Sequence, residues 1–325
     1  MRYDSVPAQT IVTVLGMHRS GTSLVTRLLN LMGVFLGAPE DLMPASQHNE
    51  RGYWEHTAIV ALNDEILYRC GGSWYQPPKF VDGWAFDPDL SSLRQSARSL
   101  VAETFGYQPI WGWKDPRTCL TFPFWKTVVL PTHIVICLRN PLEVAYSFQK
   151  SQNISFDHAS HLWLTYVSSS LRYSQGIKRL VLFYEDMMRN PQQCITRLAY
   201  FIGRSDLVDD KQWMETVLRE VSNELHHHRF PPVDVIDNSD LHFAIRSLYA
   251  VLRSVVTVTP CCENSNSAQS IDFHALSLFS IQAERFLRDQ QKLIEEYNEL
   301  SHASEVSERR LAEVSAHYEG ELAER

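Results

Sequence analysis

The stretch Ile11–Leu31 reads IVTVLGMHRSGTSLVTRLLNL and decides the fold. It opens with an apolar, β-branched run, Ile11–Leu15, which is typical of a buried parallel strand. A turn bounded by Gly16 and Gly21 follows, and from Thr22 the leucines recur at helical spacing. Strand, glycine turn and helix form a cradle for an anion, because glycine lets the backbone fold closely and the first helical N–H groups point at the ligand. The stretch therefore predicts a phosphate-binding loop at the centre of an α/β domain.

This loop differs from the nucleotide-triphosphatase pattern at one decisive position. Gly16 and Gly21 have that pattern's spacing, and Ser23 occupies its hydroxyl position. Thr22, however, stands where the pattern has lysine, and the cation lies within the loop, at Arg19. A loop without that lysine holds the β- and γ-phosphates of ATP poorly. The loop suits a smaller tetrahedral anion on one side of an adenosine nucleotide. The alternative interpretation is a glycine turn between strand and helix, in which Arg19 has no role in binding.

The composition narrows the class of protein. The chain has 325 residues, of which 44% are hydrophobic, enough for one large core or for one domain with an appendage. The net charge of −8 argues against a general nucleic-acid partner. The six cysteines are scattered without metal-binding spacing and indicate reduced thiols. We see no basic-then-apolar leader and no apolar run near the roughly 20 residues of a membrane span, so we expect a soluble protein of the cytoplasm.

Alternating strand and helix patterns follow the opening stretch. Further strands are expected at Ile110–Trp113, His133–Leu138 and Leu180–Tyr184. Helices are expected at about 57–69, 89–105, 120–129, 156–176 and 191–201, with more helices over 206–258. Repeated β–α units predict a parallel sheet with helices on both faces. The loop-rich segments 33–54 and 70–88 are expected beside the site.

Polar residues follow these strands directly. Lys114-Asp115-Pro116-Arg117 comes after the second strand, and Arg139-Asn140-Pro141 after the third, with Ser147 eight residues beyond Arg139. Open α/β sheets bind ligands outside the carboxyl ends of their strands. The third strand also ends in Arg139, whereas an NTPase would place its Mg²⁺-holding aspartate there. These segments predict an anion site without a metal.

The C-terminal part has a different composition. Acidic residues outnumber Lys and Arg by 12 to 6 over 270–325, and apolar residues recur there in an alternating four-three pattern. We therefore divide the chain into a catalytic domain over 1–258, a linker over 259–269 and a long helix or coiled coil over 270–325. A coiled coil predicts a homo-oligomer. The alternative is a single helix that folds back on the domain.

Three separate pieces together resemble one family, the sulfotransferases that use 3′-phosphoadenosine 5′-phosphosulfate (PAPS). The pieces are His18-Arg19-Ser20-Gly21-Thr22-Ser23, Leu138-Arg139-Asn140-Pro141 with Ser147, and Tyr184-Glu185-Asp186. Lys114-Asp115-Pro116 is similar to a segment of the tyrosylprotein branch, and Gly52-Tyr53-Trp54-Glu55 looks more like bacterial members. The resemblance spans about residues 11–203 and implies a P-loop-type fold.

The resemblance implies a role for each piece. The loop from His18 through Ser20, Gly21 and Thr22 to Ser23 would hold the 5′-phosphosulfate, with Arg19 as its cation. Arg139 and Ser147 would bind the 3′-phosphate, which distinguishes PAPS from ATP, and Tyr184 would lie near the adenine. From the chemistry, Lys114 can stabilise charge on the bridging oxygen and the sulfate as the bond breaks.

The base that takes the acceptor proton is expected among four residues. Relatives use a histidine or a glutamate. Glu55 is the first choice, since it follows a long loop beside aromatic residues that would raise its pKa. Glu40 is the rival, because its distance from the loop is closer to the tyrosylprotein spacing; His56 and His48 rank lower. Arg117 either binds the acceptor or pairs with Asp115.

The function expected from these observations is sulfuryl transfer to a hydroxyl, with a carbohydrate or glycan as acceptor. The acceptor rests on the family and on aromatic residues of the segment 70–88, which stack on sugars: Trp74, Tyr75 and Trp84. A P-loop nucleotide kinase or NTPase is the second interpretation. A third is an inactive nucleotide-binding module whose C-terminal helix forms oligomers.

Overall fold

A computed structural model describes residues 9–45, 52–221, 230–257 and 282. The linker predicted over 259–269 and the helix predicted over 270–325 lie outside the described residues, apart from 282, and stay predictions. His48 also lies outside the described residues.

The described chain forms a four-stranded parallel sheet with the order β2-β1-β3-β4. The strands are β1 (Thr10–Leu15), β2 (Ile110–Lys114), β3 (His133–Leu138) and β4 (Lys178–Phe183). β1 pairs with β2 and β3 on its two sides, with Val12 opposite both Gly112 and His133. All four strands were predicted from their apolar runs, and each matches its expected place to within three residues at either end.

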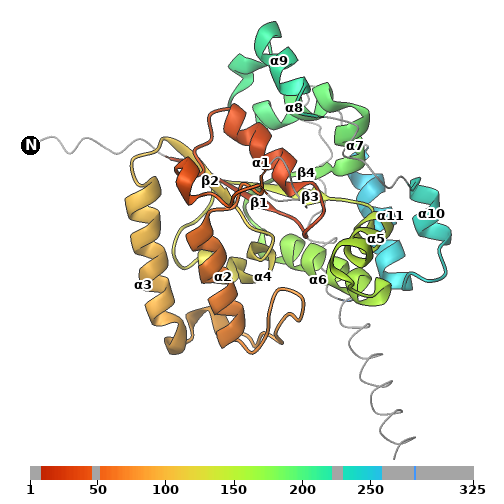
Figure 1. Cartoon of the computed structure of the whole chain (residues 1–325), viewed down its shortest axis with the longest axis horizontal. Coiled ribbons are helices and arrows are strands. Elements are labelled where there is room, and N and C mark those ends of the chain that lie inside the picture. Colours follow the sequence, from red (N-terminus) through yellow and green to blue (C-terminus); the bar gives the residue numbers. More distant parts are fainter. Residues whose placement is uncertain (1–8, 46–51, 222–229, 258–281, 283–325) are drawn as a thin grey trace, which may run out of the picture. The chain divides into compact units, whose positions relative to one another are not determined.

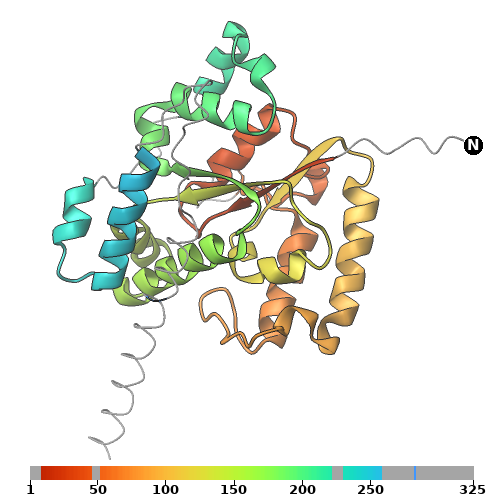
Figure 2. The same cartoon turned by 180° about the vertical axis from the view of Figure 1, so that it is seen from behind.

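Helices cover both faces of this sheet, as predicted (Figures 1 and 2). On one face, α1 (Thr22–Leu31) and α8 (Pro191–Phe201) pack on Val12, Val135 and Leu182 in one buried cluster. On the other side lie α2 (Thr57–Arg69), α4 (Thr118–Trp125) and α6 (Phe156–Tyr173). β1, β2 and β3 are buried after their first residue, whereas β4 is buried only over its last three. Coverage on both faces explains the continuous apolar sequences of the buried parts.

The remaining helical elements connect or flank this core. They are η1 (Pro39–Asp41), η2 (Trp84–Phe86), η3 (Pro88–Leu90), α3 (Ser91–Leu100), η4 (Val101–Phe105), α5 (Pro141–Gln152), α7 (Tyr184–Arg189), η5 (Ser205–Leu207), α9 (Lys211–Leu218), α10 (Pro232–Asp237) and α11 (Phe243–Thr257). The helices expected over 206–258 are thus present, in separate pieces.

Two helix predictions need correction. The helix predicted over 89–105 is α-helical only from Ser91 to Leu100, and its last turn, Val101–Phe105, is a π-helix. The helix predicted over 120–129 begins at Thr118 and ends at Trp125. It begins earlier because Thr118 N–H already donates to the Asp115 carbonyl, 2.9 Å away, in the turn that leaves β2.

Because the four strands are parallel, their carboxyl ends meet at one edge of the sheet. The predicted glycine loop leaves β1 there, Lys114 ends β2, Arg139 follows β3 and Tyr184 follows β4. The fold therefore brings four segments that are far apart in the sequence to a single edge.

Candidate active site

The loop between β1 and α1 has the backbone that a phosphate cradle requires. Arg19 and Gly21 adopt positive φ angles of 68° and 81°. A Cβ atom at Gly21 would lie 2.5 Å from Cδ2 of Tyr184, so only glycine lets the Tyr184 ring rest on the loop. The residue that precedes α1 is Gly21, which has no side chain to cap the helix. The first N–H groups of the helix point toward the side where a phosphate cradle holds its anion.

The hydroxyl residues of this loop do not all face the same way. Ser20 and Thr22 are buried, whereas Ser23 is only partly covered. The Ser23 hydroxyl donates to the Tyr53 carbonyl at 3.2 Å and lies 3.3 Å from Lys114 Nζ. Ser23 is thus the loop hydroxyl that contacts the lysine at the end of β2.

Arg19 and Arg139 lie in direct contact. Arg139 Nη1 donates to the Arg19 carbonyl oxygen at 3.0 Å, and Arg19 Nε donates to the Ser147 hydroxyl at 2.8 Å. Burial lowers the pKa of Arg19, and the charge of Arg139 lowers it further. Two arginine charges that repel each other in a partly desolvated place favour a bound anion between them.

Arg139 is held from several sides. Its Nε donates to Glu143 Oε2 at 2.8 Å, and its guanidinium lies over the Tyr184 ring, 4.5 Å from the centroid. The side chain is 10% exposed. Its orientation is therefore set by its neighbours rather than by solvent.

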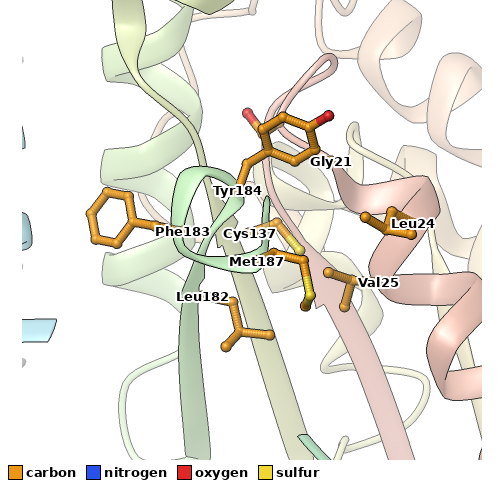
Figure 3. A pocket seen from close by; sticks show the side chains of 9 residues that line it. Gly21, Leu24, Val25, Cys137, Leu182, Phe183, Tyr184 and Met187 are labelled. Carbon is orange, nitrogen blue, oxygen red and sulfur yellow. The ribbon is translucent and has the colours of Figure 1, made fainter. Parts of the chain in front are cut away.

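A small pocket adjoins this cluster between α1 and the start of α7 (Figure 3). It is lined by Ser20, Gly21, Leu24, Val25, Cys137, Leu182, Phe183, Tyr184 and Met187. The lining is mostly apolar and offers no cation. The charged contacts of the site thus lie with Arg19 and Arg139 rather than in this pocket.

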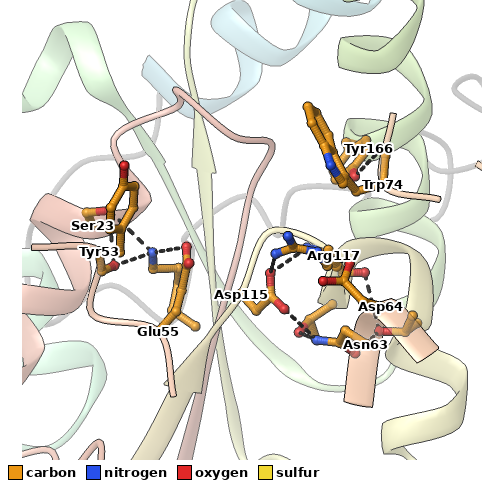
Figure 4. Close-up of polar contacts among 12 residues, drawn as sticks. Ser23, Tyr53, Glu55, Asn63, Asp64, Trp74, Asp115, Arg117 and Tyr166 are labelled. Atoms are coloured by element: carbon orange, nitrogen blue, oxygen red, sulfur yellow. Dashed lines mark hydrogen bonds and ion pairs between the residues drawn. The ribbon is translucent and has the colours of Figure 1, made fainter. Parts of the chain in front are cut away.

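Lys114 and Glu55 form a buried ion pair beside the loop. Lys114 Nζ lies 2.6 Å from Glu55 Oε1 and also donates to the Tyr53 carbonyl (Figure 4). The two side chains are only 1% and 8% exposed. Burial raises the pKa of Glu55, while the charge of Lys114 acts in the opposite direction. Lys114 and Glu55, whose pKa is raised, thus form a buried pair, and Lys114 also contacts Ser23.

His18 faces aromatic rings rather than polar groups. Its ring centroid lies 4.8 Å from that of Trp74 and 6.1 Å from that of Tyr166, and its Nε2 has no hydrogen-bond partner among the described residues. Burial lowers the pKa of His18 well below 6.5, and the charges of Arg117 and Lys114 add to this effect. These surroundings favour the neutral form of the imidazole.

Arg117 pairs with two carboxylates. Its Nη1 lies 3.0 Å from Asp115 Oδ1, and its Nε contacts Asp64 on α2 (Figure 4). Asn63 donates to Asp115 at 2.8 Å and accepts from the indole of Trp125 at 2.8 Å. Of the two interpretations of Arg117, the structure therefore contains the pairing with Asp115.

The other candidate bases have different surroundings. Glu40 is exposed on η1. His56 is buried, 5.8 Å from the Phe105 ring and 4.0 Å from Asp41, and burial lowers its pKa. Neither is brought into contact with Lys114 or Ser23. Among the three candidates that the structure describes, Glu55 is the one that contacts Lys114.

The aromatic segment over 70–88 divides between surface and core. Tyr75 is exposed and Trp74 partly buried. Trp84 is 9% exposed and stacks on Phe80 with centroids 4.2 Å apart. Trp84 is thus a core residue, which corrects its place among residues expected to meet an acceptor.

Several residues of this edge were missed in the sequence. Glu143 lies four residues beyond Arg139, the spacing at which helical side chains meet, and this signal was available. Asn63 and Asp64 carried no such signal, because their partners Asp115 and Arg117 are more than 50 residues away.

Among the described residues, no group of three or more His, Cys, Asp or Glu side chains is arranged to hold a metal ion. None of the described helices combines the length and the apolar character needed to cross a lipid bilayer. A place in the cytoplasm stays a prediction.

The fold is a parallel α/β sheet whose carboxyl edge gathers Arg19, Lys114 and Arg139, and comparison with known proteins identifies its class. The model of the sulfotransferase family matches residues 12–209, which is more than half of the chain. This chain belongs to the sulfotransferase family and is an enzyme of sulfuryl transfer.

Solved structures of the same kind are similar to this chain at low identity. The sulfotransferase domain of the Synechococcus PCC 7002 olefin synthase is 15% identical, with a TM-score of 0.39, over 88% of this chain and 96% of that one. Retinol dehydratase in complex with androsterone and the inactive cofactor PAP is 15% identical, with a TM-score of 0.38, over 87% and 81%. A sulfotransferase from Mycobacterium avium is 17% identical, with a TM-score of 0.34, over 70% of each chain. No curated protein matches this chain.

Proposed function

We propose that this enzyme takes its sulfuryl group from PAPS and that Arg19 and Arg139 hold the two ends of the donor. The contact between Arg139 and the Arg19 carbonyl, at 3.0 Å, carries this proposal. It brings the glycine loop and the turn after β3 together, so that one bisphosphorylated adenosine can meet both. Arg19 and the first N–H groups of α1 hold the 5′-phosphosulfate. Arg139 and Ser147 hold the 3′-phosphate.

Glu55 and Lys114 are proposed as the reacting pair. Glu55 takes the proton of the acceptor hydroxyl as the acceptor oxygen forms its bond to sulfur. The bond between sulfur and the 5′-phosphate oxygen breaks, and 3′-phosphoadenosine 5′-phosphate (PAP) leaves. Lys114, 2.6 Å from Glu55, stabilises the charge that develops on the bridging oxygen and the sulfate. Proton removal by Glu55 and charge stabilisation by Lys114 thus occur at the same edge of the sheet.

The acceptor is proposed to be a hydroxyl of a carbohydrate or glycan. Trp74 and Tyr75 support this, because aromatic faces stack on sugar rings and both lie on the segment next to His18. The cluster of Arg117, Asp64 and Asp115 adds polar groups of the kind that bind sugar hydroxyls.

Calorimetry with PAP and ADP tests the donor assignment, because ADP lacks the 3′-phosphate. Arg139→Ala should weaken PAP binding by about 10- to 100-fold, the loss of hydrogen bonds to a charged group, and change ADP binding little. Arg69→Ala is the control, since Arg69 forms an exposed pair with Glu65 at the same four-residue spacing. An equal loss of both nucleotides would contradict the 3′-phosphate site, and magnesium-dependent phosphate release from ATP would favour the NTPase interpretation.

A further inference from the structure

The nitrogens of Arg139 are unequally engaged. Nε donates to Glu143 and Nη1 to the Arg19 carbonyl, while the flat face lies over Tyr184. Nη2 donates to no group in the part of the chain that the structure describes. The contacts of Nε and Nη1 therefore decide where Nη2 points.

Within the described part of the chain, two donors, one on each carboxylate oxygen, contact Glu143. Oε2 accepts from Arg139 Nε at 2.8 Å, and Oε1 accepts from the backbone N–H of Phe230 at 3.3 Å. The Glu143 side chain is 1% exposed. A buried carboxylate is tolerated only where such partners answer its charge. The two contacts therefore depend on each other.

Phe230 is held by the first turns of α5 in two further ways. Its carbonyl accepts from Asn140 Nδ2 at 3.1 Å, and its ring stacks on Tyr146 with centroids 5.4 Å apart and an angle of 23°. Phe230 lies just before α10 and some 90 residues from these partners. The segment that leads into α10 and α11 is thus fastened to the same turn that carries Arg139.

We propose that Glu143 is a positioning residue for the sulfuryl donor, which orients Arg139 for the 3′-phosphate and couples that orientation to the docking of Phe230. This inference rests on the proposed donor site. Glu143 acts through Arg139 and does not itself touch the donor. The negative charge of Glu143 alone would repel a phosphate. Glu143 nevertheless tightens donor binding, because it holds Arg139 in the orientation that leaves Nη2 for the 3′-phosphate.

The substitution Glu143→Gln separates the effect of the negative charge of Glu143 from its effect on the orientation of Arg139. Arg139 Nε and Phe230 N–H meet different oxygens of Glu143. The amide of glutamine replaces one of these oxygens with an NH₂ group, which must therefore face one of the two donors in this side-chain orientation. One of the two contacts is therefore lost, with almost no change in side-chain shape. Simple removal of a repelling charge predicts tighter PAP binding; loss of positioning predicts weaker binding.

The test is calorimetry of the full chain with PAP and with ADP. We expect Glu143→Gln to weaken PAP binding by about 10-fold, one charge-assisted contact, and to leave ADP within about 2-fold. Phe230→Ala, which removes the stacking on Tyr146, should give a smaller loss that is also confined to PAP. In the double variant the two losses should not add, since both act through Arg139. Glu65→Gln is the matched control, because it changes an exposed Arg–Glu pair of the same spacing.

Each result decides the matter. PAP binding that is unchanged or tighter in Glu143→Gln would overturn the positioning role. If thermal unfolding shows that Glu143→Gln does not fold, Phe230→Ala decides alone, and an equal effect on PAP and ADP in that variant would overturn the coupling. If the wild-type chain binds PAP no better than ADP, the donor assignment itself fails, and the positioning role fails with it.

Discussion

At the scale of single residues, the buried pair of Lys114 and Glu55 is the most demanding feature of the site. Two charges removed from water are costly unless each meets a partner, and here Nζ and Oε1 lie 2.6 Å apart. Burial nevertheless raises the pKa of Glu55. A carboxylate with a raised pKa is a better base than an exposed one, which is the property that proton removal from a hydroxyl requires.

Glu55→Gln should therefore lower kcat by about 10²- to 10⁴-fold, the usual contribution of a general base, with PAP binding retained. The substitution also leaves Lys114 without its carboxylate partner, and breaking a buried pair costs about 3–5 kcal/mol. Thermal unfolding must accompany the rate measurement for this reason. A folded Glu55→Gln enzyme with an unchanged rate would assign the base elsewhere.

The pH dependence follows from the same residue. A base must be ionised to act, so the rate falls as pH drops through the pKa of Glu55. Because burial raises this pKa above 4.5, the acid limb of the profile of kcat/KM should lie above that of an ordinary glutamate. The limb should disappear in Glu55→Gln. A limb that persists in that variant would belong to another group.

At the scale of elements, the packing of the glycine loop against Tyr184 joins the starts of α1 and α7. Gly21 combines a φ of 81° with a Tyr184 contact that leaves no room for a Cβ atom. Gly176 has nearly the same φ, 78°, but nothing lies within 4 Å of its Cβ position. Substitutions at Gly21 and Gly176 should therefore introduce similar backbone strain, but only the substitution at Gly21 should also disturb Tyr184.

Gly176→Ala should cost about 1–2 kcal/mol of unfolding free energy, the penalty of a side chain in the left-handed region. Gly21→Ala should cost more, because Tyr184 must also move, and it should weaken PAP binding while Gly176→Ala does not. Urea unfolding and calorimetry measure these two effects. Equal losses in both variants would mean that the contact between the loop and Tyr184 contributes nothing.

The elements also show how far the sequence alone leads. All four strands were predicted, because a buried parallel strand is a short apolar run whatever its neighbours are. The last turn of the helix predicted over 89–105 was not, because the repeat of apolar residues does not distinguish the π-helical turn Val101–Phe105 from an α-helical one. Arg19, Lys114 and Arg139 were predicted to share one edge because each follows or ends a predicted strand, and the structure places them at that edge.

The partners of these residues were harder to predict. Phe230 contacts Glu143 across 87 residues, and Asn63 contacts Asp115 across 52. No local pattern connects residues so far apart, and only the folded chain brings them together. The sequence therefore led to the charged residues of the site, but not to the groups that orient them.

At the scale of the whole molecule, the predicted C-terminal helix concerns assembly. The segment 270–325 carries 12 acidic and 6 basic residues and an alternating four-three pattern of apolar ones, which predicts a coiled coil. Every side chain of the proposed site lies before residue 258. We therefore expect assembly and catalysis to reside in different parts of the chain.

Deletion of 270–325 should lower the molar mass measured by light scattering to that of a monomer and leave PAP affinity unchanged. Assembly through a heptad seam buries the apolar positions of two or more helices, so its loss removes the contact. An unchanged oligomer after deletion would place the interface elsewhere. A monomeric full chain would contradict the coiled coil.

The central claim is that one bisphosphorylated adenosine meets both arginine turns. A crystal structure of the enzyme with PAP tests it most directly. We predict the 5′-phosphate on the loop between Arg19 and Ser23 and the 3′-phosphate on Arg139 and Ser147. PAP bound with its 3′-phosphate away from Arg139 would contradict the account.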